Sequence, residues 1–99
     1  MALGTLSGSA RYTADQALGG SGKTVRVFNA TFLNAASAGT LVLRNGTTAS
    51  GDIWVQSIGT GASRTDTLNW EEGLVFTNGL FFDKDTNVTA VVLTYRIEV

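Results

Sequence analysis

The 99-residue sequence contains no cysteine and no histidine. The absence of cysteine removes any disulfide framework, and the absence of histidine removes His-dependent catalytic triads and nearly every zinc site. Charged residues are sparse, at 15% of the chain, and the seven basic residues are scattered and nearly balanced by eight acidic ones. A nucleic-acid partner requires a dense positive surface, which this distribution does not predict.

Long apolar runs are missing as well. No segment approaches the ~20 apolar residues of a membrane-spanning helix, so no membrane partner is expected. The first ten residues have neither the basic start nor the apolar run of a secretory signal. What remains is a chain rich in Gly, Thr, Ser, Asn and Ala, long enough for one domain with one core. This composition indicates a β protein with large uncharged surfaces, some of which would face other subunits.

The clearest structural pattern lies at the end of the chain, in residues 86–99, which are rich in β-branched residues and contain no Gly or Pro. Such side chains suit a pleated sheet. The apolar residues occupy both faces of this segment as far as Val92 and one face afterwards. The pattern predicts a central strand that is buried on both sides at its start only.

Further short strands, separated by turn residues, are predicted in residues 10–12, 24–34, 40–44, 52–58, 64–70, 74–77 and 80–82. The 64–70 strand alternates polar and apolar residues like an edge strand. No long helix is indicated, and residues 13–18 fit either a single helical turn or a plain loop. About seven short strands without a helix predict an all-β fold. We expect a single-domain antiparallel β-sandwich, jelly-roll-like, over residues 10–99.

Local features refine this fold. Between Val27 and Phe28 the apolar residues change face, which predicts either a strand buried on both sides or a β-bulge. Asn78 and Gly79 lie between two apolar runs and are typical of a β-hairpin with a type I′ turn, and residues 71–73 are expected to form another turn. The strand periodicity predicts a core made mostly of Val25, Val27, Leu41, Leu43, Ile53, Val55, Val75, Phe81, Val88, Val91 and Leu93.

Candidate ligand sites are few. Residues 19–24 end in Gly-Lys-Thr like a phosphate-binding loop, but the earlier Gly of that motif is Ala17 here and a strand follows instead of a helix. Residues 83–87 resemble the start of an EF-hand, yet its Gly and Glu are replaced by Val88 and Thr94. We therefore predict no catalytic residue, cofactor or metal, and hence no enzyme. For residues 83–87, the alternatives to an EF-hand are a polar turn whose side chains bond to their own backbone or a looser surface calcium site formed by Asp83, Asp85 and Asn87.

Aromatic residues suggest another kind of site. Tyr12, Trp54, Trp70 and Tyr95 would suit a platform that stacks on sugars, or they belong to the core or to a subunit interface. The second interpretation is favoured, because aromatic residues of an all-β chain more often lie in the core or in an interface. The residues that we select as interface candidates are Leu3, Leu6, Trp54 and Trp70.

Residues 39–46 form a strand that ends in a polar turn, and residues 73–81 and 88–95 continue the same alternation of strand and turn. In style and order these segments resemble the small head-associated proteins of tailed bacteriophages: decoration or cement proteins and short head spikes. The resemblance covers residues 25–95. It implies a β-sandwich or jelly-roll fold, no enzymatic activity, and a place on the virion surface, as a homotrimer bound to the major capsid protein. The alternative is a carbohydrate- or receptor-binding module of a phage tail fibre or spike.

Residues 1–9 are predicted to form an N-terminal arm outside the sandwich. The arm carries two isolated leucines, Leu3 and Leu6, among small residues. Ordering its backbone costs roughly 1–2 kcal/mol per residue, whereas burying two leucines returns about 3–6 kcal/mol. We therefore expect the arm not to fold back on its own sheet. It would become ordered on the sheet edge of a neighbouring molecule.

Overall fold

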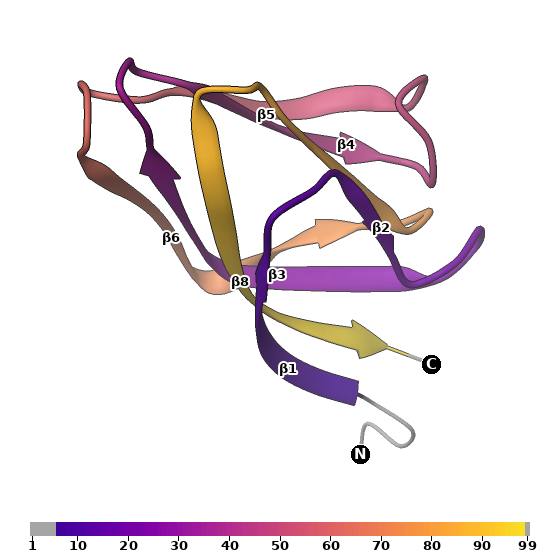
Figure 1. The fold of residues 1–99 in the computed structure, drawn as a ribbon. Helices are drawn as coiled ribbons and strands as arrows, with labels where there is room; N and C mark the ends of the chain where they lie inside the picture. The colour runs from indigo at the N-terminus through magenta and orange to yellow at the C-terminus, as the bar shows by residue number, and fades with distance from the viewer. Residues whose placement is uncertain (1–5, 99) are drawn as a thin grey trace.

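A computed structural model describes the backbone of residues 6–98 and the side chains of residues 11–98. The described chain consists of strands and short connections, and none of it forms a helix long and apolar enough to cross a membrane. The strands, shown in Figure 1, are β1 (Leu6–Tyr12), β2 (Gln16–Leu18), β3 (Thr24–Asn34), β4 (Thr40–Asn45), β5 (Asp52–Ile58), β6 (Thr65–Phe76), β7 (Leu80–Lys84) and β8 (Val88–Glu98).

The strands form two four-stranded sheets, with the order β1-β8-β3-β6 in the first and β2-β7-β4-β5 in the second. Within them the first strand pairs with the last, the second with the seventh, the third with the sixth and the fourth with the fifth, always antiparallel. This nested pairing is the connectivity of a jelly roll. The predicted all-β, jelly-roll-like sandwich is therefore confirmed, with eight strands. One of them, β2, replaces the helical turn or loop considered for residues 13–18.

Strand β8 lies inside the first sheet, between β1 and β3. Ala90 and Val91 are both fully buried. Because adjacent residues of a strand point to opposite faces, the start of β8 is covered on both sides. The residues from Tyr95 onward are partly exposed. The prediction of a central strand, buried on both faces only at its start, is confirmed.

Strand β3 contains the predicted change of face. Val27 and Ala30 are both fully buried, and the pairing of β3 with its two neighbours skips Phe28. Phe28 is thus the extra residue of a β-bulge, which moves the inward face from odd to even positions. Of the two alternatives for this strand, the bulge is confirmed.

The hairpin predicted at Asn78 and Gly79 is wrong. Strand β6 belongs to the first sheet and β7 to the second, so the residues between them carry the chain across the sandwich. A type I′ turn needs positive φ at both central residues, and only Gly79 has it, at 76°. Asn78 is instead bound to two other connections: its Oδ1 accepts the N–H of Gly22 at 2.6 Å, and its own N–H donates to Asn45 Oδ1 at 3.0 Å. These long-range bonds outweigh the local turn preference.

Strand β6 runs through residues 71–73, where a turn was predicted. Its pairing with β3 passes from Asn69 directly to Leu74, so the intervening residues form an irregularity within one continuous strand. Gly73 supplies the positive φ, 86°, that this irregularity requires. The position of β6 at the edge of the first sheet confirms the edge strand predicted for residues 64–70.

The core lies between the two sheets, and three of its predicted members are wrong. Ile53 is 51% exposed. Val75 and Phe81 are only partly buried, whereas their neighbours Phe76 and Phe82 are fully buried. In an apolar run, a shift of one residue exchanges the two faces, and the sequence pattern left that shift open. The core residues that the prediction and the structure share are Val25, Val27, Leu41, Leu43, Val88, Val91 and Leu93, and the predicted Val55 is partly buried against them.

The arm predicted for residues 1–9 differs from the structure over its second half. Leu6–Ser9 belong to β1, whose backbone pairs with β8 along its whole length. The expectation that this segment would not fold back on its own sheet is wrong there, because it counted leucine burial alone. Hydrogen bonds to the edge of β8 stabilise the strand in addition. Leu3 lies outside the described residues.

Candidate interaction surface

Exposed apolar side chains gather on strand β5. Ile53, Trp54 and Ile58 are the exposed large hydrophobic residues of the described chain, at 51%, 43% and 70% exposure. All three lie within Asp52–Ile58, the outer strand of the second sheet. This strand pairs with β4, and none of residues 6–98 pairs with its other side. We call Asp52–Ile58 the β5 edge.

A β-bulge explains why Ile53 faces outward. In the pairing with β4, Val55 lies opposite Leu43 but Ile53 lies opposite Arg44, so Trp54 is an extra residue. Leu43 is fully buried, and residues directly opposite each other share a face. Val55 therefore faces the core, against which it packs, while Ile53 lies on the outer face. The prediction that both residues line the core is right for Val55 alone.

Trp54 lies between the β5 edge and the core. Its ring stacks on that of Phe76, with centroids 5.3 Å apart and planes inclined by 26°. Phe76 is the last residue of β6 and is fully buried. Trp54 thus covers part of the core at the side of the sandwich and leaves 43% of its surface exposed.

The other aromatic residues considered for a sugar platform do not join Trp54. Trp70, Tyr12 and Tyr95 pack against the core. The hydroxyls of Tyr12 and Tyr95 lie 3.3 Å apart in a hydrogen bond. Partial burial, together with this bond, raises the pKa of Tyr12 to about 12. The interpretation as core residues is therefore confirmed for three of the four.

The structure does not bring the four interface candidates together. Trp54 lies on the β5 edge, Trp70 on β6 and Leu6 in β1, while Leu3 is outside the described residues. Sequence analysis missed Ile53 and Ile58 as surface residues. A signal was present, because the apolar positions 53, 54, 55 and 58 cannot all lie on one face of a regular strand.

The other edge strands differ from β5 in ways that discourage association. Strand β2 has only three residues. Strand β6 carries Asp66, Glu71 and Glu72, and β1 carries Arg11. Short length and charge are the common means by which natural sheets protect their edges. The β5 edge has neither beyond Asp52 at its first position, and its one protective feature of this kind is the bulge at Trp54.

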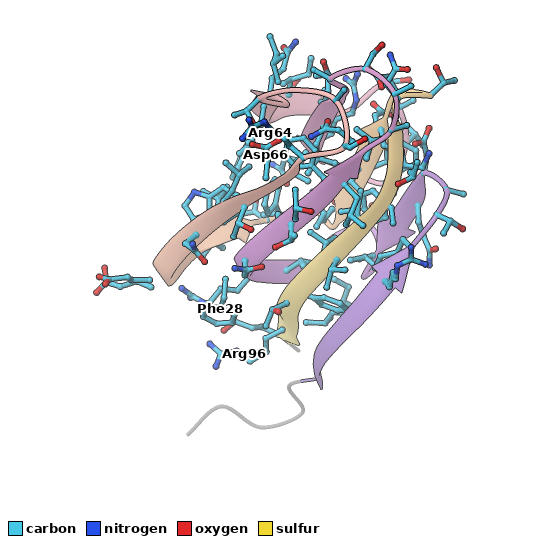
Figure 2. All side chains as sticks on the ribbon, turned by 60° about the vertical axis from the view of Figure 1, so that its left-hand side comes forward. Phe28, Arg64, Asp66 and Arg96 are labelled. Atoms are coloured by element: carbon cyan, nitrogen blue, oxygen red, sulfur yellow. The ribbon has the colours of Figure 1, made fainter. Side chains whose placement is uncertain are left out.

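The outer face of the first sheet carries an ionic cluster. Arg96 lies over the ring of Phe28, with Cζ 5.6 Å from the ring centroid, and Figure 2 shows the two side chains next to each other. Glu98 accepts from Arg96 at 2.9 Å and from Arg26 at 3.4 Å. Partial burial acts to raise the pKa of Glu98, but the two guanidinium groups outweigh it, and the pKa is lowered. Both arginines are paired with Glu98, so the cluster supports the bulge at Phe28.

A second polar cluster joins the connections at one end of the sandwich. The buried side chain of Asn34 donates to the carbonyl of Arg64 and to Asp66 Oδ2, each at 2.8 Å, and accepts the N–H of Gly39 at 2.8 Å. Asp66 also accepts the N–H and the hydroxyl of Thr60, at 3.0 and 2.9 Å. These bonds, the N–H bond foremost, lower the pKa of Asp66. Figure 2 shows Arg64 and Asp66 close together here. The carboxylate has protein donors on both oxygens, so its role is structural.

The candidate calcium residues do not converge. Asp83 is paired with Arg44. Asp85 Oδ1 accepts the N–H of Asn87 at 2.8 Å, and its Oδ2 accepts the N–H of Thr40 at 3.0 Å. Within the described part of the chain, no three acidic side chains form a group that would hold a metal ion. Residues 6–98 also enclose no pocket. The polar-turn interpretation therefore describes this segment.

Comparison with known proteins identifies no family, since the sequence matches no protein-family model and no curated protein. The function is therefore inferred from the fold and from the β5 edge.

Proposed function

We propose that this protein is a non-enzymatic structural protein of a virion, which decorates and stabilises the surface of a tailed-bacteriophage head. Its partner there is the major capsid protein. It acts as a homo-oligomer, and the resemblance to decoration proteins implies three copies. The β5 edge carries this proposal, because apolar side chains gathered on an open sheet edge suit association with another protein.

The fold is compatible with this role. Eight-stranded jelly rolls occur in viral capsid domains and in lectins, although a fold alone does not define a function. A decoration protein needs a rigid body and exposed backbone edges to which a strand can be added. The two packed sheets form such a body, and the β5 edge is open along its outer side. The low content of charged residues, 15%, agrees with surfaces that contact other proteins.

A carbohydrate- or receptor-binding module of a tail fibre or spike is the second candidate, and the exposure of Trp54 favours it. An indole ring that is 43% exposed offers area for stacking on a sugar. Against this function, Trp54 already stacks on Phe76, and Trp70 packs on the core. A platform of two exposed tryptophans is therefore absent from the described structure.

Binding to phage heads tests the proposal. The full-length protein is mixed with heads assembled from the major capsid protein encoded beside its gene, and co-sedimentation and the temperature of head disruption are measured. We expect saturable binding and a higher disruption temperature. The decoration role is refuted if the protein does not bind heads but binds a glycan, and if Trp54→Ala abolishes glycan binding. A gene neighbourhood without a major capsid protein would also count against it.

A further inference from the structure

Two asparagines of the sequence, Asn45 and Asn78, are followed by glycine. An Asn-Gly step is chemically labile, because glycine has no Cβ to keep its backbone nitrogen away from the preceding side chain. In deamidation, this nitrogen bonds to Cγ of the asparagine, and the bond from Cγ to Nδ2 breaks. The amide NH2 group and the proton of the glycine nitrogen leave together as ammonia. Water then opens the cyclic imide to aspartate or isoaspartate.

The fold brings the two Asn-Gly steps together. Asn45 ends β4, and Asn78 lies between β6 and β7. Asn45 Oδ1 accepts the N–H of Asn78 at 3.0 Å, and its Nδ2 donates to Thr77 Oγ1 at 3.2 Å. The N–H of Gly46 donates to the carbonyl of Gly79 at 3.2 Å. These bonds tie the end of β4 to the segment that crosses between the sheets.

The connection from β2 to β3, residues 19–23, completes this group. Asn78 Oδ1 accepts the N–H of Gly22 at 2.6 Å. The N–H of Gly79 donates to the carbonyl of Lys23 at 2.7 Å. The three segments meet at the right-hand end of the sandwich in Figure 1. We call residues 19–23, 45–46 and 77–79 the Asn-Gly cluster.

Both reactive nitrogens are buried and bonded in the folded protein. The N–H groups of Gly46 and Gly79 each donate to a carbonyl, and both glycines are buried. The nitrogen attacks only after it loses its proton, and burial beside a carbonyl oxygen opposes the resulting negative charge. The side chains of Asn45 and Asn78 are also held, by hydrogen bonds to other groups. Reaction at either step therefore requires that the cluster opens.

We propose that Asn45 and Asn78 are the deamidation sites of this protein, and that the Asn-Gly cluster keeps both closed in the folded state, so that each step protects the other. This inference does not depend on the role proposed above. Deamidation at either site adds a negative charge. The isoaspartate product also lengthens the main chain within the cluster, so the first reaction should expose the second site.

Peptide mapping by mass spectrometry measures the reaction at each site. Trypsin cleaves after Arg44, Arg64 and Lys84, which places Asn45 and Asn78 on separate peptides. The full-length protein is incubated in buffer and in concentrated urea, where the unfolded chain reacts. In urea we expect these two asparagines to react ahead of the others. In the folded protein we expect both rates to be lower by about tenfold or more, because only the open fraction reacts.

Alanine substitutions test the mutual protection. Asn78→Ala removes the bond to Gly22 and should speed deamidation at Asn45 about tenfold, and Asn45→Ala should do the same at Asn78. Asn87→Ala is the matched control. It removes the same kind of side chain beyond the other end of β7, and it should leave both rates unchanged.

Val91→Ala separates local opening of the cluster from global unfolding. Val91 is fully buried in the core and lies outside the cluster. Its truncation lowers the stability of the whole domain but leaves the bonds of the cluster intact. Both deamidation rates should therefore stay near those of the wild type. Urea midpoints measured on each variant show that it is folded during the incubation.

Four results would overturn the proposal. The first two are equal rates in folded and unfolded wild-type protein, and a folded wild type in which another asparagine reacts first. The third is a rate at one site that alanine at the other leaves unchanged. The fourth is a Val91→Ala protein in which both sites react as fast as in the cluster variants. The first two results need the wild-type protein alone, so they remain decisive if an alanine variant does not fold.

Discussion

Gly59 lies where any side chain would meet the buried amide of Asn34. A Cβ atom at this position would lie 2.7 Å from Asn34 Cγ and 2.8 Å from Nδ2, and real Cβ atoms do not approach other atoms within 3.0 Å. The backbone of Gly59 is held in place, because its N–H donates to the carbonyl of Gly39 at 2.7 Å. We therefore predict that Gly59→Ala displaces the amide of Asn34 and destabilises the fold.

The size of this effect follows from the bonds of Asn34. Its amide makes hydrogen bonds to the carbonyl of Arg64, to Asp66 and to the N–H of Gly39, each at 2.8 Å. Each such bond contributes about 0.5–1.5 kcal/mol net, and displacement of the amide weakens all of them together. We expect Gly59→Ala to lower the free energy of unfolding by about 2–4 kcal/mol, a large part of the usual stability of a small domain.

Equilibrium unfolding in urea measures this change, with Gly61→Ala as the matched control. A Cβ at Gly61 would lie 3.4 Å from the flexible side chain of Arg64, so we expect a change within about 0.5 kcal/mol. In an Asn34→Ala background, the collision is gone, and Gly59→Ala should then cost much less than in the wild type. Equal effects of the two glycine substitutions, or full additivity with Asn34→Ala, would refute the reasoning.

Further predictions concern the core, the dependence of stability on acidic pH, and strand β1. Val91→Ala removes two methyl groups from a fully buried side chain and should lower the free energy of unfolding by about 1–3 kcal/mol. Ile58→Ala on the β5 edge should change it by less than about 0.5 kcal/mol. Similar urea midpoints for the two variants would contradict the assigned core. The pKa of Asp66 is lowered from 3.8 in the folded protein, so its stabilising contribution is complete above about pH 4 and is lost as the pH falls through the lowered pKa. Asp66→Asn should therefore make the urea midpoint of unfolding fall less steeply as the pH is lowered into the acidic range. An unchanged pH dependence would contradict the hydrogen bonds assigned to the Asp66 carboxylate. Deletion of residues 2–9 removes part of β1 and its hydrogen bonds to β8, and should cost about 2 kcal/mol or more. Deletion of residues 2–5 leaves β1 intact and should cost less, so equal losses would argue against the pairing of β1 with β8.

Local patterns in the sequence predicted several elements well. The bounds predicted for β3 and β5 agree with the structure, and β8 was recognised as central because both of its faces begin apolar. The bulge at Phe28 was one of the two alternatives that the change of face after Val27 left open, and the pairing of β3 decided between them. These features depend on the alternation of neighbouring residues, which a strand imposes wherever it lies in the fold.

The candidate site was less visible. Trp54 was selected as an interface residue, but Ile53 was placed in the core and Ile58 was not selected. The bulge at Trp54 arises in the pairing of β5 with β4, and a run of three apolar residues does not reveal which of them is extra. Trp70, the other selected tryptophan, packs on the core. Strand β6 is an edge strand, but its inner face still lies toward the core between the two sheets.

The sequence by itself determined the class of fold, the positions of most strands and most of the core, because period-two alternation and turn residues act over a few positions. The tertiary structure decided which sheet each strand joins, since pairing depends on residues far apart in the chain. It turned Asn78 and Gly79 from an expected hairpin into a crossing between sheets, through bonds to distant connections. It placed Leu6–Ser9 on the edge of β8. It also left β5 without an outer partner among residues 6–98, and so created the surface from which the function is inferred.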